Sequence, residues 1–257
     1  KKSGEFVIKA PVNGKAAVMN YALKNFIKEK FVLVLDADTF IDRDLIKRLV
    51  YHFKDKKVAA VVSSVKVYKP KTIVQFLQYY EYLFSILSRK ALSKINGLVV
   101  VHGAGSMFRT ETLRKVGYFD ENNYTEDMEI GMRLLMSGYK VENSIKAISY
   151  TIAPSSLYKL FRQRIRWFSG YLFNIIKYIK YARKSKSDAL WRITIPFTLI
   201  SIALSFLIVI GLIYTIVTIP IPYYGIIVNT SPLFFMNSVF TPVSFLNINS
   251  QLILELV

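Results

Sequence analysis

Apolar and polar positions alternate along the first part of the chain in blocks of two kinds. A continuous apolar run, typical of a buried strand, covers residues 31–35. Strand-like runs rich in β-formers cover residues 58–67 and 98–102, and a shorter one covers residues 6–9. Helical spacing covers residues 14–23, 72–95, 110–116 and 124–137, and a further helix is expected from a cap at Asp42 through Phe53. Strands that alternate with helices predict an α/β domain with a mostly parallel sheet.

The next predicted helix, capped by Ser155 or Ser156, has two unlike faces. At about 100° per residue, one face carries Leu157, Phe161, Ile165 and Phe168. The opposite face carries Gln163, Arg166, Trp167 and Gly170, flanked by Arg162 and Arg164. A tryptophan on the polar side can anchor the helix at a membrane interface, with arginines on lipid headgroups. It can equally stack on a sugar ring while Arg and Gln hold a diphosphate.

An uncharged segment follows this helix. Residues 193–219 would extend roughly 40 Å as a helix, enough to cross a bilayer with some tilt. Basic residues gather on its N-terminal side, which the positive-inside rule places in the cytoplasm: Lys177, Lys180, Arg183, Lys184, Lys186 and Arg192. Residues 220–257 are apolar but broken by Gly, Pro and Asn. They can form a re-entrant or interfacial segment, or an outer loop leading to a second span.

The charges are segregated along the chain. Lys and Arg (35) outnumber Asp and Glu (17), for a formal net charge of +18, and every charge except Glu255 lies before residue 193. Such a basic part suits nucleic acid, anionic lipid or a phosphorylated substrate as partner. We expect no nucleic acid, because no groove-reading module is visible and an apolar segment follows. The absence of cysteine excludes disulfides and thiolate metal sites, and it fits a reducing compartment.

Two pairs of carboxylates are candidates for chemistry. Asp36 and Asp38 follow the apolar run 31–35, where ligands of α/β sheets bind, and together they could reach one Mg²⁺ or Mn²⁺. The same aspartates would also serve merely to end the strand. Glu126 and Asp127 follow Thr125 at the start of a predicted helix. Capping and the helix dipole would explain all three residues, and a general base held on a fixed element is the functional alternative.

Five short motifs occur in order before the apolar segment, and the ordered set is more specific than any one of them. They are Gly14-Lys15-x-Ala17-x-x-Asn20-x-x-Leu23, Asp36-Ala37-Asp38, Gly103-x-Gly105-Ser106-x-x-Arg109, Thr125-Glu126-Asp127 and Gln163-Arg164-x-Arg166-Trp167. On these residues the chain resembles the membrane-embedded family 2 glycosyltransferases, in particular the processive cellulose, hyaluronan and poly-N-acetylglucosamine synthases. The resemblance covers residues 5–219. It implies a GT-A-like (Rossmann-like) catalytic domain, followed by interfacial amphipathic helices and at least one transmembrane helix.

The resemblance also implies a role for each motif. Asp127 would be the catalytic base, and Asp36 and Asp38 would hold the divalent cation, Mg²⁺ or Mn²⁺. The nucleotide-sugar donor, a UDP-sugar, would contact Lys15, Asp36, Asp38, Gln163, Arg164 and Arg166. The acceptor would lie against Trp167, Gly105, Ser106 and Glu126.

The implied domains are a partial catalytic domain over 1–153, interfacial helices over 154–190, a transmembrane helix over 191–219 and an apolar segment over 220–257. In the family, a first strand and an early aspartate motif would lie upstream of Lys1. We therefore expect the sheet and the donor pocket to be incomplete in this chain.

The expected function is inverting transfer of a sugar from a nucleotide-diphosphate sugar to a growing polysaccharide. The protein would be integral to the plasma membrane, with its catalytic part cytoplasmic and with membrane lipid and a glycan or lipid-linked acceptor as partners. One alternative is a non-processive transferase that adds a single sugar to a lipid or lipid carrier. A more distant alternative is a non-catalytic membrane scaffold with the same fold.

Overall fold

The computed structural model describes residues 9–183, 185 and 187–218, and its contacts divide the chain into two units, residues 1–198 and 199–257. The strand expected over residues 6–9 lies almost wholly outside the described residues, and so does the apolar segment 220–257. The fold that positions the candidate site belongs to the first unit.

Five strands form one mixed sheet in the order β1-β4-β3-β5-β2. Their bounds are β1 Phe31–Leu35, β2 Thr39–Ile41, β3 Val58–Val67, β4 Ala104–Arg109 and β5 Lys140–Thr151. Among them, only β3 and β5 pair in parallel, and the other three pairs are antiparallel. The expectation of a mostly parallel sheet is therefore wrong for the described residues. The reason is β4, which runs against both of its neighbours, so the helix between β3 and β4 does not connect parallel strands.

The apolar run 31–35 does form a strand, but not the buried parallel one that its composition suggests. β1 stands at the end of the strand order and pairs antiparallel with β4, with Val32 opposite Phe108 and Leu33 opposite Met107. Its first four residues are partly exposed and Leu35 is exposed. Apolarity alone does not distinguish an edge strand from a central one, because both bury at least part of their side chains.

Residues 98–102 are buried, except for the partly exposed Val100, without forming a strand, which corrects a second expectation. The strand begins later, at Ala104. The segment lies under a helix, because the Val101 N–H donates to the Asp127 carbonyl (3.2 Å) and the Val99 carbonyl approaches Gly131. A Cβ built at Gly131 would lie 1.8 Å from that carbonyl oxygen, so only glycine allows this contact. Burial against a helix, rather than sheet pairing, therefore explains the apolar run.

The helices are α1 Lys15–Asn25, α2 Leu45–His52, α3 Ile73–Lys94, α4 Thr110–Lys115, α5 Glu126–Met136, α6 Leu157–Ala182 and α7 Ile195–Thr218, with a π-helical turn over Leu190–Thr194. Alternate strand residues face two cores. Ala60, Val62 and Phe108 pack with residues of α1, α4 and α5, whereas Val61 and Met107 pack against α2. The N-cap of α2 is Asp44, without a side-chain capping bond, and not Asp42 as expected.

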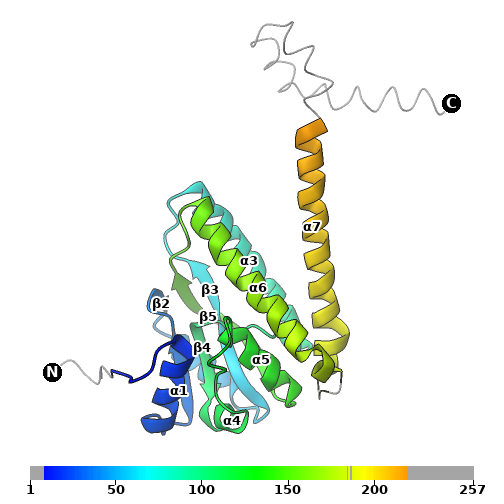
Figure 1. The fold of residues 1–257 in the computed structure, drawn as a ribbon. Helices are drawn as coiled ribbons and strands as arrows, with labels where there is room; N and C mark the ends of the chain where they lie inside the picture. Colours follow the sequence, from blue (N-terminus) through cyan, green and yellow to red (C-terminus); the bar gives the residue numbers. More distant parts are fainter. Residues whose placement is uncertain (1–8, 184, 186, 219–257) are drawn as a thin grey trace, which may run out of the picture. The chain divides into compact units, whose positions relative to one another are not determined.

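Helices α3 and α6 lie side by side (Figure 1) and are tied together where they begin. Thr72 caps α3 with a reciprocal bond to Gln75, and its hydroxyl donates to the Ser155 carbonyl (3.2 Å) just before α6. Ser156 caps α6 through the Lys159 N–H, as expected. The apolar face of α6 points away from the protein, since Leu157, Phe161, Ile165 and Phe168 are 49–69% exposed.

One helix among the described residues is long and apolar enough to cross a membrane. The candidate span covers Leu190–Ile208, and 11% of it is buried within the structure. The α-helical part, Ile195–Thr218, agrees with the segment expected from the uncharged run.

Candidate active site

A lysine and two carboxylates from three different elements meet at one edge of the sheet. Lys15 begins α1, Asp36 follows β1 and Glu126 begins α5. The Lys15 Nζ lies 2.6 Å from Asp36 Oδ1 and 3.0 Å from Glu126 Oε1. Gly103 completes the contact, because a Cβ there would lie 2.5 Å from Asp36 Oδ1 and 2.6 Å from Lys15 Nζ. The sequence motifs that supplied these residues are therefore one site in space.

Asp127 lies beside this cluster and has an unusual ionisation. Burial raises the pKa of its carboxyl group to about 6, and the neighbouring Glu126 charge contributes to the rise, whereas Lys15 opposes it. Its Oδ1 accepts a hydrogen bond from the Met128 N–H (2.8 Å). A carboxylate with a pKa near neutrality holds a proton well enough to act as a general base.

Capping does not account for Thr125. It occupies the N-cap position of α5 but makes no side-chain capping bond. Its hydroxyl instead accepts from the buried Asn174 amide of α6 (2.9 Å). Gly170 of α6 also touches it, since a Cβ at Gly170 would lie 2.3 Å from Thr125 Cγ2. Thr125 therefore fixes α6 against the start of the helix that carries Glu126 and Asp127.

Asp36 and Asp38 supply carboxylate oxygens, the type of ligand that a hard divalent cation prefers. The Asp36 side chain is 35% exposed, and the exposed Asp38 carboxylate has no hydrogen bond or ion pair to any described residue. No group of three or more His, Cys, Asp or Glu that could hold a metal occurs among the described residues. Two carboxylates still fit Mg²⁺ or Mn²⁺, which complete their shell with water and substrate phosphate oxygens.

The residues of the polar motif of α6 differ in their exposure and in their contacts. Gln163 and Trp167 are partly buried, and the Gln163 Oε1 is buried without a hydrogen-bond partner among the described residues. Arg164 donates to Glu81 of α3 (2.6 Å), and its guanidinium stacks over the Trp167 ring at 4.6 Å from the centroid. Arg166 is exposed and has no such partner among the described residues.

Gly105 and Ser106 lie within β4, where both are in contact with other residues of the protein. The Ser106 hydroxyl is fully buried and donates to the His102 carbonyl (2.6 Å). Gly105 has a φ of +107°, and a Cβ there would meet Ser63 Oγ at 2.7 Å. Their predicted contact with an acceptor stays a prediction.

Sequence reasoning overlooked three residues of α3 that lie near the site, namely Glu81, Tyr82 and Arg89. Burial lowers the pKa of Arg89, while the charges of Tyr82, Asp127 and Glu81 oppose this. Burial and the Arg89 charge lower the pKa of His102 to about 3, so this imidazole is neutral and its Nε2–H donates to the Ser63 carbonyl. Charged residues within an aromatic, apolar helix were the signal that could have indicated them.

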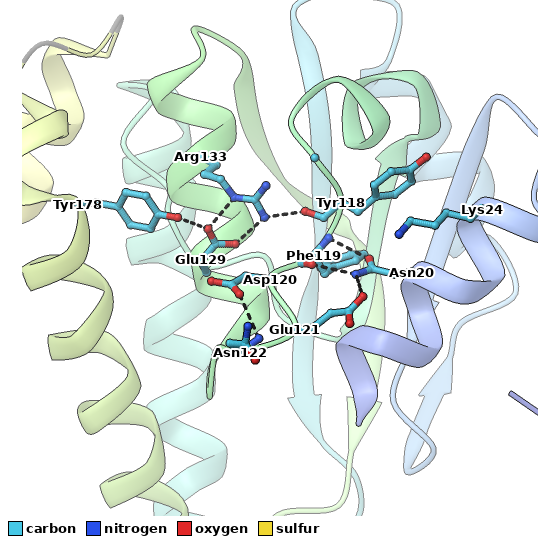
Figure 2. Close-up of a pocket in the computed structure, with 11 residues that line it drawn as sticks. Asn20, Lys24, Tyr118, Phe119, Asp120, Glu121, Asn122, Glu129, Arg133 and Tyr178 are labelled. Carbon is cyan, nitrogen blue, oxygen red and sulfur yellow. Dashed lines mark hydrogen bonds and ion pairs between the residues drawn. The ribbon is translucent and has the colours of Figure 1, made fainter. Parts of the chain in front are cut away.

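A separate hollow of about 450 Å³ lies between α1, the segment 117–122, α5 and α6 (Figure 2). Glu129 of α5 is fully buried in its wall, receives both Nε and Nη2 of Arg133 (2.6 Å each) and accepts from the Tyr178 hydroxyl of α6. Arg133 also donates to the Tyr118 carbonyl (2.6 Å). These three side chains are paired with one another, and the bond between Glu129 and Tyr178 joins α5 to α6.

Comparisons with known proteins identify a family and several relatives. The family described as glycosyl transferase family group 2 matches residues 31–241. Poly-beta-1,6-N-acetyl-D-glucosamine synthase from Staphylococcus aureus (strain COL) is 30% identical over 159 residues, which are 61% of this chain and 38% of that synthase. The synthase of the same name from Staphylococcus epidermidis is 30% identical over 174 residues, which are 66% of this chain and 42% of that synthase.

A solved structure shows a related fold. A mannosyltransferase from Pyrobaculum calidifontis, in complex with GDP-Man and Mn²⁺, matches with a TM-score of 0.52 and 25% identity, over 66% of this chain and 44% of that one. The GT-A-like α/β fold expected from the motifs is confirmed, with a mixed sheet. The chain spans about two fifths of the length of the curated synthases that it matches.

Proposed function

The chain belongs to glycosyl transferase family group 2, and from that membership we propose that it transfers a sugar from a nucleotide-diphosphate sugar to a growing polysaccharide at the cytoplasmic face of a membrane. The similarity to two poly-N-acetylglucosamine synthases supports a polysaccharide as product. The proposal concerns the whole protein, of which this chain contains the family's later motifs.

The observation that carries the proposal is the position of Asp127. It begins a helix directly beside Glu126, Lys15 and Asp36, and burial holds its pKa at about 6. In a direct, inverting displacement, an acceptor hydroxyl oxygen forms a bond to the anomeric carbon while the bond to the diphosphate oxygen breaks. Asp127 would take the proton of that hydroxyl, and a base of this kind contributes roughly 10²–10⁴ in rate.

The remaining residues suit the donor and the leaving group. Lys15 Nζ lies 2.6 Å from Asp36, so its ammonium group would contact the phosphates of a nucleotide bound there. Gln163 of α6 carries a side-chain amide whose oxygen has no partner among the described residues, and its NH₂ group would donate to a phosphate oxygen. Arg166 is an exposed guanidinium with no partner among the described residues. A divalent cation held by Asp36 and Asp38 would neutralise negative charge on the diphosphate. Cationic side chains that face this charge act in the same direction, because the diphosphate carries the negative charge that develops as it leaves.

The location at a membrane rests on two features of the described chain. The span Leu190–Ile208 is long and apolar enough to cross a bilayer, and basic residues precede it. The apolar face of α6 is exposed, as expected of a helix that lies in an interface. Both features favour a protein at a membrane, and the basic residues favour a catalytic part on the cytoplasmic side.

The test is incubation of the full-length protein in membranes with a panel of labelled nucleotide-sugars, with and without Mn²⁺ and a chelator. We expect one sugar to be consumed in a metal-dependent manner and to enter a product of high molecular weight whose anomeric configuration is opposite to that of the donor. A product carrying a single sugar on a lipid would contradict polysaccharide synthesis. Absence of turnover with every donor would contradict the enzyme and favour a scaffold.

A further inference from the structure

Arg164 and Arg166 of α6 have different surroundings, although both belong to the motif expected to clamp the diphosphate. They are two positions apart in a helix, so their side chains leave it in different directions. Arg166 is exposed and unpaired among the described residues. Arg164 is only 20% exposed, and both sides of its guanidinium have a neighbour.

The neighbours of Arg164 come from α3 and from its own helix. The Glu81 carboxylate of α3 lies 2.6 Å from Arg164 Nη2. On the other side, the guanidinium stacks over Trp167, one helical turn further along, at 4.6 Å from the ring centroid. A planar guanidinium can donate a hydrogen bond in its plane and stack with its face at the same time. The face of the Trp167 ring that it covers is then closed to a ligand, and only the other face is free to bind one.

We propose that Glu81 is a positioning residue, which holds Arg164 against one face of Trp167 and leaves the other face of the ring for the acceptor sugar. This inference rests on the proposed function. It assigns donor contact in the α6 motif to Gln163 and Arg166, and it assigns Arg164 to the orientation of Trp167. Glu81 thereby couples α3 to the acceptor side of the site, and neither residue contacts the reacting atoms.

The exposure of the ion pair between Glu81 and Arg164 allows this role to be separated from a role in stability. The side chain of Glu81 is 50% exposed, so the pair by itself adds little to the stability of the fold. Loss of Glu81 should therefore leave the fold intact and release only the guanidinium and the ring. Glu111 provides a matched control, because it is also an exposed glutamate with an ion pair of 2.6 Å, here to Lys115 on α4.

The test uses the two tryptophans of the chain, Trp167 and Trp191. In a variant in which Trp191 and any tryptophan outside this chain are replaced by Phe, Trp167 is the only indole, and its emission and its quenching by acrylamide report directly on the ring. We expect Glu81→Ala to shift the emission and to raise the quenching, Glu81→Gln to do so less, and Glu111→Ala not at all. Melting curves of the variants should coincide with that of the parent.

Kinetics of the full-length protein give the second readout. We expect Glu81→Ala to lower kcat about ten- to a hundredfold, as a slight misplacement of a reactant does. The donor KM should stay within about twofold, because the uniform binding of the donor is unchanged. An unchanged Trp167 signal, or a donor KM that rises about tenfold as for a lost diphosphate contact, would overturn the proposal. If the parent protein transfers no sugar, the proposed function fails, and the fluorescence alone still decides whether Glu81 orients Trp167.

Discussion

Asp127 shows at the scale of a single residue how position changes chemistry. The same sequence, Thr125-Glu126-Asp127, is compatible with simple capping of α5, but burial and the adjacent Glu126 raise the pKa of Asp127 to about 6. Asp36, Lys15 and Glu126 are joined by ion pairs at the same edge of the sheet. This single carboxyl group therefore allows two predictions, one for the reaction and one for the fold.

The catalytic prediction concerns Asp127→Asn in the full-length protein. We expect kcat to fall roughly 10²–10⁴-fold, because the amide cannot take the acceptor proton, while donor affinity stays unchanged. In the parent protein, kcat/KM should decrease as the pH falls below about 6, where Asp127 of the free enzyme becomes protonated, and should be level above it. Initial rates and donor binding across pH measure both effects, with Glu111→Gln as a remote control. Undiminished transfer by Asp127→Asn would exclude Asp127 as the base.

The stability prediction concerns the same substitution in the absence of substrate. An aspartate that is free in water has a pKa of 3.8, whereas the pKa of Asp127 in the fold is about 6, so folding disfavours the ionised form. The cost is therefore fully present above about pH 6, and it disappears below the unfolded pKa. It is at most about 3 kcal/mol, since one pKa unit corresponds to about 1.4 kcal/mol. Asp127→Asn should raise the melting temperature at pH 7.5 and lose this advantage near pH 4. If Asp127→Asn raised the melting temperature equally at both pH values, the raised pKa of Asp127 would not be its cause.

The contact between α5 and α6 matters most at the scale of secondary-structure elements. Gly170 brings α6 against Thr125, and the buried Asn174 donates to the Thr125 hydroxyl. Near the far end of α6, Tyr178 donates to the buried Glu129 of α5. Helix α6, which carries the Arg and Trp motif, therefore contacts α5, which carries the candidate base, at two places along its length.

Gly170→Ala tests the contact of α6 with Thr125. A Cβ at Gly170 would lie 2.3 Å from Thr125 Cγ2, so α6 or Thr125 must move, and overpacking of this kind costs about 1–3 kcal/mol. We expect a lower melting temperature together with a lower kcat, because Asp127 lies two residues from Thr125. Gly211→Ala on α7 is the matched control, since a Cβ there has nothing within 4 Å. Its effect on melting should be neutral or slightly favourable, and equal effects of the two substitutions would contradict this contact.

The molecule as a whole divides into a basic part with a buried core and an apolar helix that can cross a bilayer. The absence of cysteine in the chain permits single labels at chosen positions. Phe161 on α6 and Ile46 on α2 are 63% and 51% exposed, so a cysteine at either place should leave the fold unchanged. They differ in the surface on which they lie.

A fluorophore at each of these positions tests the orientation of the protein in nanodiscs. We expect the label at Phe161→Cys to be quenched by brominated lipids and shielded from iodide, because the apolar face of α6 should lie in the interface. The label at Ile46→Cys should show the opposite behaviour. If iodide reaches both labels equally, the exposed face of α6 does not rest on lipid.

The sequence predicted correctly those elements whose formation depends on residues close together in the chain. The β3 run, the capped helices α3 and α6, and the apolar helix α7 lie as predicted, because periodicity and capping act within a few residues. The strands β2 and β5 were not anticipated, since their composition is mixed. The prediction of a strand over residues 98–102 is wrong because burial under α5 and burial in a sheet select the same apolar residues.

By itself the sequence determined the α/β class, the order of the motifs, the starts of the long helices and the segregation of charge, all of which are local or compositional properties. Only the tertiary structure decided the direction of β4, the place of β1 at the end of the strand order, and the meeting of Lys15 with Asp36 and Glu126. It also decided that Arg164 pairs with Glu81, a residue 83 positions away. Such contacts depend on which faces pack together, and no short stretch of sequence contains that information.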